Sequence, residues 1–109
     1  MRASGFLLVF STAPNQKAAV KIADFLLDRK LASCVNISAP INSLYLWKGK
    51  KERAKEVLLL IKTRKSLYPK LQQSILKMHP YEVPEIIGIS LNAGSPDYLS
   101  WVYHETKAR

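Results

Sequence analysis

The chain has 109 residues, of which 48% are hydrophobic and 23% are charged. This length and composition predict one domain over residues 1–109 with a modest hydrophobic core, and they exclude a disordered chain. The formal net charge of +9 favours encounters with anionic molecules, although it carries no information about the fold.

Cysteine content and hydropathy indicate the compartment. The single cysteine, Cys34, has no second thiol with which to form an intrachain disulfide, which fits reducing surroundings. The apolar run over residues 6–10 is too short for a membrane span or for the hydrophobic region of a signal peptide. We therefore expect a cytoplasmic protein that does not bind membranes, with Cys34 as a small buried hydrophobic residue.

The N-terminal third predicts a strand and a helix. Residues 5–11 form a short apolar run that Pro14 ends, as in a buried strand that enters a turn. Residues 15–31 place apolar side chains at steps of three and four, which is the pattern of an amphipathic helix.

The middle of the chain predicts a hairpin. Residues 32–38 and 41–48 have strand character that Pro40 interrupts. Gly49, among lysines, marks the hairpin tip. Residues 55–63 then return as an apolar strand.

The C-terminal part predicts two more helices and a strand between them. Ser66 is the expected N-cap of the first helix. His79 precedes Pro80 and is therefore expected to end that helix. Residues 85–91 predict a strand, and Ser95 resembles the N-cap of a last helix.

The predicted order of elements is strand, helix, strand, strand, helix, strand, helix. This is an α+β plan, the split βαβ arrangement of ferredoxin-like domains (βαββαβ) with one added C-terminal helix. Residues 57–61 are apolar at both faces of their strand, yet two helices in this plan cover only one face of the sheet. The added helix can shield part of the other face, and we expect copies of the chain to cover the rest in a homo-oligomer.

Six segments, taken together and in this spacing, resemble the CutA family over nearly the whole chain. The segments are STAP at 11–14, LASC at 31–34, SLYLWKGK at 43–50, EVLLLIKT at 56–63, HPYEVPE at 79–85 and DYLSW at 97–101. The resemblance implies a ferredoxin-like protomer in a homotrimer, similar in architecture to the PII signalling proteins, with clefts between subunits. It also implies a role in tolerance of divalent ions, notably copper.

The family's proposed metal ligands are a cysteine at the end of the first strand and two histidines before the Pro-Tyr step. The corresponding residues here are Ser11, Met78 and His79, so His79 is the one predicted metal residue. Its implied ligand is copper(II) or another divalent ion, which folding does not require. The alternative is that His79 caps the end of its helix by hydrogen bonds to the last carbonyls.

The resemblance also places six residues near the intersubunit cleft, for which our hypothesis is a small polar ligand. Its predicted residues are Trp47, Lys62, Tyr81, Glu85, Tyr98 and Trp101. For the two tryptophans the alternative is packing in the subunit interface. Lys62 either blocks pairing at the sheet edge or, beside Glu85, meets an anionic group of the ligand.

Other classes of function are disfavoured by the residues present. The chain has two histidines, and His104 falls in the last helix, so no acid, base and nucleophile set is evident and we expect a non-enzyme. RNA-recognition domains share the order of elements, but the strand over residues 55–63 has no aromatic residue on which a base could stack, so we expect no nucleic-acid partner. The alternative to a metal-binding protein is a trimeric scaffold or a small-ligand binding protein without metal function.

Overall fold

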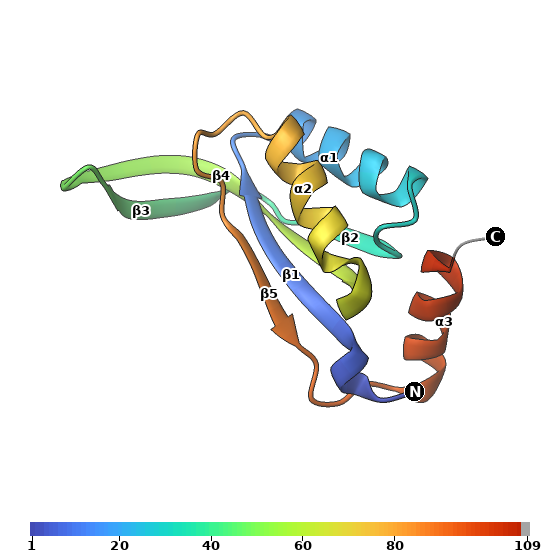
Figure 1. Cartoon of the computed structure of the whole chain (residues 1–109). Coiled ribbons are helices and arrows are strands. Elements are labelled where there is room, and N and C mark those ends of the chain that lie inside the picture. Colours follow the sequence, from blue (N-terminus) through green and yellow to red (C-terminus); the bar gives the residue numbers. More distant parts are fainter. Residues whose placement is uncertain (108–109) are drawn as a thin grey trace.

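The computed structural model describes residues 1–107, which form a sheet with helices packed against it (Figure 1). The predicted order of strands and helices is confirmed, with the second strand divided in two near Pro40. The elements are η1 (Ala3–Gly5), β1 (Phe6–Ala13), α1 (Gln16–Asp28), β2 (Cys34–Ile37), β3 (Ile41–Trp47), β4 (Lys50–Arg64), η2 (Lys65–Leu67), α2 (Tyr68–Met78), β5 (Ile86–Ser90) and α3 (Pro96–Thr106), where η marks a 3-10 turn.

The sheet has the strand order β2-β4-β1-β5. The remaining strand, β3, pairs with residues 50–56 of β4, whereas β2 pairs with residues 59–62 of the same strand. All neighbouring strands are antiparallel. The two central strands, β1 and β4, are paired along the whole of β1, from Phe6 opposite Arg64 to Ala13 opposite Val57. With α1 and α2 on the sheet, this arrangement confirms the predicted α+β class and fits the ferredoxin-like plan.

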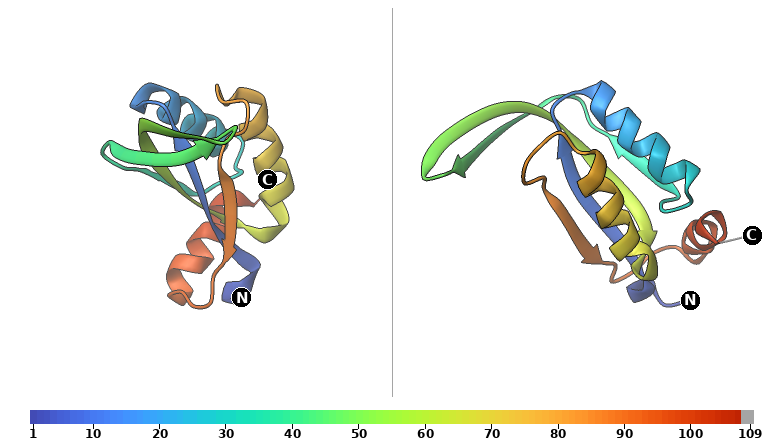
Figure 2. Two further views of the ribbon diagram at one scale, coloured as in Figure 1. Left: turned by 90° about the vertical axis from the view of Figure 1, so that its left-hand side faces the viewer. Right: turned by 45° about the horizontal axis from the view of Figure 1, so that its top comes forward.

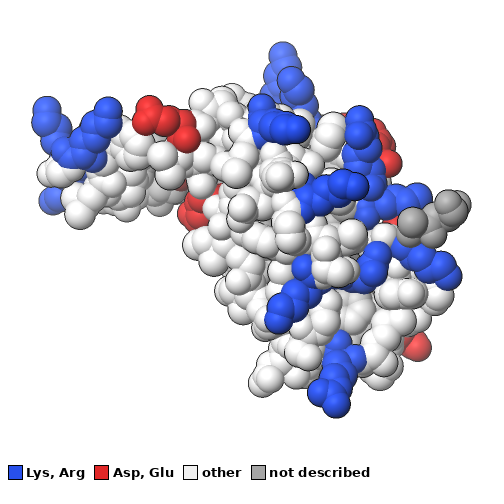
Figure 3. Space-filling model, viewed as in Figure 1, with Lys and Arg blue, Asp and Glu red and all other residues white. Residues whose placement is uncertain are grey.

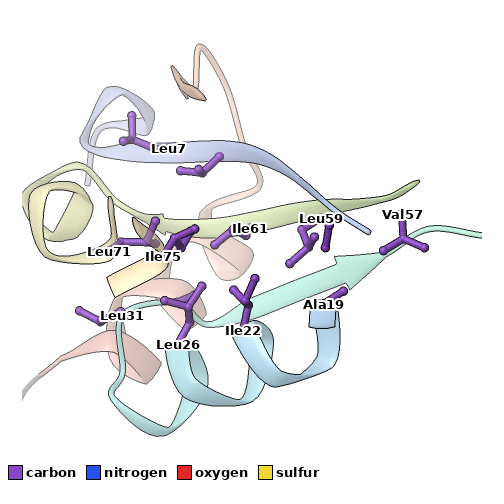
Figure 4. Close-up of a cluster of buried hydrophobic side chains, with 13 residues drawn as sticks. Leu7, Ala19, Ile22, Leu26, Leu31, Val57, Leu59, Ile61, Leu71 and Ile75 are labelled. Atoms are coloured by element: carbon purple, nitrogen blue, oxygen red, sulfur yellow. The ribbon is translucent and has the colours of Figure 1, made fainter. Parts of the chain in front are cut away.

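The main core lies between the sheet and the helices α1 and α2 (Figure 4). It takes the odd-numbered side chains of the central strands, such as Leu59 and Ile61, which meet Ile22 of α1 and Ile75 of α2. These four side chains are at most 2% exposed. Because truncating a residue of this kind to alanine costs about 2–5 kcal/mol, this layer fixes α1 and α2 on one face of the sheet.

The helix ends show where local sequence signals succeed and fail. Asn15 caps α1, since its Oδ1 accepts a hydrogen bond of 2.8 Å from the amide three residues later. The predicted N-cap at Ser66 is wrong, because Ser66 lies in η2 and α2 starts after it with Pro69 in its first turn. His79 ends α2 as predicted, whereas Ser95 precedes α3 without a side-chain capping bond.

The hairpin of β3 and β4 extends away from the rest of the domain (Figure 2). Lys48 and Gly49 form its two-residue tip, with φ values of 52° and 79°. Positive φ at both positions matches the twist of the flanking strands. Pairing with β3 makes β4 start at Lys50, whereas the predicted strand began at residue 55.

The face of the sheet opposite α1 and α2 is covered at one end only. There α3 packs Leu99 and Val102 against Phe6 of β1, so the added helix shields part of this face as expected. Farther along, Ile87 and Ile89 of β5 are 52% and 51% exposed. Residues 1–107 thus leave an apolar sheet face uncovered.

Candidate functional site

A pocket of about 780 Å³ lies beside the hairpin. Its walls come from β3, from Glu56 of β4 and from the segment that joins α2 to β5. Three of the predicted cleft residues line it together, namely Trp47, Tyr81 and Glu85, and we call these three the hairpin group. The volume lies within the range of small-molecule sites.

A partly buried hydrogen bond forms one wall of this pocket. The Tyr81 hydroxyl donates to Glu56 Oε2 over 2.7 Å, and Glu56 is only 7% exposed. Burial, followed by the hydrogen bond to Glu56 and its negative charge, raises the pKa of Tyr81 well above its usual value. At neutral pH the phenol is therefore a hydrogen-bond donor that holds the carboxylate in place.

Sequence reasoning missed Glu56. The available signal was an acidic residue placed directly before the apolar run of β4, a position that alone does not distinguish a solvated charge from a buried one. The structure shows that Tyr81, 25 residues away, supplies the partner.

His79 is held by two hydrogen bonds within the chain. Its Nδ1 accepts from the Tyr81 amide at 3.1 Å, so the ring proton is on Nε2, which donates to the Thr12 carbonyl at 2.7 Å. The His79 and Tyr81 rings also pack with their centroids 4.7 Å apart. His79 thereby connects the end of α2 to the end of β1 and to the segment that enters the pocket.

These contacts do not fit a metal site within one chain. Both nitrogens of His79 are engaged, and the residue is 8% exposed. Ser11 is fully buried, with no hydrogen-bond partner for its hydroxyl among residues 1–107, while Met78 packs against the core. Within the same residues, no three His, Cys, Asp or Glu side chains gather to hold a metal ion.

A metal role for His79 stays a prediction, and within residues 1–107 both of its ring nitrogens make hydrogen bonds in the chain. The partner differs from the expected one, because His79 bonds a carbonyl of β1 rather than a carbonyl in the last turn of its own helix.

The other predicted cleft residues form a second group, here called the helix group, of Lys62, Tyr98 and Trp101. Lys62 Nζ donates to Asn36 Oδ1 and lies 3.8 Å from Cys34 Sγ. The Tyr98 and Trp101 rings of α3 pack with centroids 5.6 Å apart.

Cys34 joins the two sides of the helix group. Burial first, and then the neighbouring Cys34 side chain, raise the pKa of Tyr98. Cys34 is partly exposed beside Lys62, so the expectation of a small buried hydrophobic residue is wrong. The reason is that its side chain points to the sheet face opposite the main core, level with Lys62.

Strand register separates the two groups along the sheet. Lys62 pairs with Leu8, which pairs with Ile89 near the end of β5. Glu85 instead precedes Ile86, the first residue of β5. One chain thus does not bring Lys62 and Glu85 together, and a cleft that contains both remains a prediction for two copies.

The chain is similar in sequence to proteins of one family. A family model described as CutA1 divalent ion tolerance protein matches residues 7–105. "Protein CutA" of Mus musculus is 46% identical over 99 residues, which cover 91% of this chain and 56% of the mouse protein. "Protein CutA, chloroplastic" of Arabidopsis thaliana is 42% identical over 101 residues, which cover 93% of this chain and 56% of the plant protein. The chain spans a little over half the length of these curated relatives.

A solved structure shows the same fold. The divalent cation tolerance protein (Cut A1) of Thermus thermophilus superposes with a TM-score of 0.91 at 37% identity, covering 94% of this chain and 99% of that chain.

Two observations bear on the compartment. No helix within residues 1–107 has the length and apolarity to cross a bilayer. The name of the plant relative places that protein in the chloroplast. A cytoplasmic location for this chain stays a prediction.

Proposed function

The chain belongs to the CutA1 divalent ion tolerance family, and on this premise we propose that it acts as a homotrimeric divalent-cation tolerance protein. The trimer is the binding unit, and its ligand is a divalent ion, with copper(II) the first to test, or a small polar molecule. Binding at the trimer has a signalling role like that of the PII proteins, which the chain resembles in architecture. No catalytic step and no nucleic-acid partner form part of the proposal.

The uncovered sheet face carries this proposal. Ile87 and Ile89 are half exposed, and Phe10 and Leu60 beside them on the same face are only partly buried. Burial of apolar surface contributes about 25 cal/mol per Å². Exposed apolar faces of this kind mark interaction sites, and further copies of the chain would remove the face from water.

The exposed aromatic residues of the hairpin also favour assembly. Tyr45 and Trp47 are 45% and 38% exposed on an arm that extends from the domain. Both lie on the same face of the β3–β4 ladder as Glu56, since they pair with Glu52 and Lys50 at even-numbered positions of β4. An arm of this shape, with tyrosine and tryptophan on the pocket side, is suited to contact a neighbouring copy.

Assembly would also complete the predicted cleft. Each chain has a hairpin group at one end of its sheet and a helix group at the other. A contact that places the hairpin of one copy over the α3 end of the next joins the carboxylate of Glu85 to the ammonium of Lys62. Such a cleft offers one negative and one positive group, which suits a small polar ligand.

Calorimetric titration of copper(II) into the purified protein near neutral pH tests the proposal, with two variants in parallel. We expect saturable binding that His79→Ala retains and that Glu85→Gln weakens, because the His79 nitrogens are engaged and the pocket offers carboxylates. Loss of binding in His79→Ala alone, with that variant still folded, would return the metal role to His79. Absence of binding in the parent protein would refute the metal function.

A scaffold without metal function is the second candidate. The engaged nitrogens of His79 favour it, because the one predicted metal ligand already has a structural role. A single stoichiometric partner protein that co-purifies with the chain, together with no copper binding, would support the scaffold.

A further inference from the structure

A second pocket, of about 620 Å³, lies at the end of the sheet where β1 begins and β4 ends. Its lining among the described residues includes three cationic side chains and no carboxylate. The polar residues that line it are Arg2, Ser4, Arg64, Lys65, Ser66 and Tyr103. The chemistry of this pocket is thus opposite to that of the acidic pocket beside the hairpin, whose lining includes Glu56, Glu82 and Glu85.

Arg64 is the fixed element of this pocket. Its Nε donates to Thr106 Oγ1 at 2.8 Å, and its Nη2 donates to the Thr106 carbonyl at 2.9 Å. The guanidinium also lies over the Tyr103 ring, 5.0 Å from the centroid. Both oxygen acceptors are uncharged, so these bonds orient the guanidinium without neutralising it. An oriented cation loses little freedom when it binds an anion.

Lys65 and Ser66 follow Arg64 directly in η2, and both are exposed. Arg2 and Ser4 face them from the start of the chain, across the Phe6 and Arg64 pair. These residues supply ammonium, guanidinium and hydroxyl groups, which are the hydrogen-bond donors that commonly bind phosphate oxygens. Basic side chains also predominate around this end of the molecule in the view of Figure 3.

We propose that this pocket binds the phosphate group of a soluble small anion, such as a phosphomonoester. The Arg64 guanidinium orients the phosphate, Lys65 and Arg2 balance its charge, and the Ser4 and Ser66 hydroxyls donate to its oxygens. The site is separate from the hairpin pocket and does not depend on the function proposed above.

Calorimetry on the full chain tests the proposal with inorganic phosphate and adenosine 5′-monophosphate as probes. The variants are Arg64→Gln and Lys65→Gln, and Lys51→Gln at the hairpin is the matched control because it removes the same charge elsewhere. We expect saturable binding that each pocket variant weakens about ten-fold and that the control leaves unchanged. Lys65→Gln keeps the test decisive if Arg64→Gln loosens α3, because Lys65 is exposed and lies outside the Thr106 contacts.

Three results would overturn the proposal. The first is no binding of either probe. The second is an equal loss in the hairpin control, which would mean that net charge alone attracts the anion. The third is binding only to phosphatidylcholine vesicles that contain phosphatidic acid, which would assign the basic surface to a lipid.

Discussion

Replacing His79 by alanine should destabilise the protein strongly, because the ring joins three segments. The variant loses the bond to the Thr12 carbonyl and the bond from the Tyr81 amide. A hydrogen bond contributes about 1 kcal/mol, and a buried group left without a partner costs about 1–3 kcal/mol. Thr12 is only 7% exposed, so its carbonyl is poorly placed to find water. Including the lost contact with the Tyr81 ring, we expect a loss of about 2–4 kcal/mol in the free energy of unfolding.

Urea unfolding measures this loss, at one protein concentration because assembly would couple stability to concentration. His104→Ala is the matched control, since His104 is the other histidine and lies exposed on α3. The control should change stability by no more than about 0.5 kcal/mol. If both variants behave alike, the two hydrogen bonds of His79 do not stabilise the fold and the structural role is refuted.

Four further substitutions test individual contacts. Tyr81→Phe should lower stability near neutral pH by about 1 kcal/mol, because Glu56 loses its donor. The raised pKa of Tyr81 contributes stability that is fully present below the ordinary tyrosine pKa of about 10 and is lost as the pH rises above it. The free energy of unfolding should therefore decline less steeply with alkaline pH in the variant than in the parent protein. An identical decline in both would exclude Tyr81 as the cause. Ser11→Ala should be neutral or stabilising by up to about 1 kcal/mol, because it removes a buried hydroxyl that has no partner among residues 1–107. Thr63→Val should destabilise the protein, because it removes a buried hydroxyl that donates to the Leu31 carbonyl at 2.6 Å. A change of the same sign for both variants in urea unfolding would contradict this reasoning. Ile87→Glu should convert the proposed trimer to monomers in size-exclusion chromatography, and an unchanged elution volume would place the interface elsewhere.

The sequence predicted the elements where hydrophobic period decides the structure. The apolar spacing of α1 and the continuous apolar run of β4 were both sufficient, because burial on one or both faces leaves a clear pattern. The first part of β4 was missed because residues 50–54 are largely charged, and only pairing with β3 makes them a strand. The start of α2 was misplaced because Ser66 is a good cap in isolation, but a 3-10 turn takes its place.

The candidate site was less predictable because its contacts join distant residues. His79 was singled out from its motif, but its partner is a backbone carbonyl 67 residues away, which no side-chain pattern reveals. Trp47, Tyr81 and Glu85 were predicted together and line one pocket. The contact of Tyr81 with Glu56 and that of Lys62 with Cys34 depend on how the strands are paired, which the sequence alone did not specify.

Multi-angle light scattering of the purified chain in solution tests the proposed assembly most directly. We expect a mass near three times the chain mass of 12.3 kDa, because copies of the chain cover the apolar sheet face. A mass of one chain, with the protein folded, would show that the face stays open to water and would contradict the trimer as the binding unit.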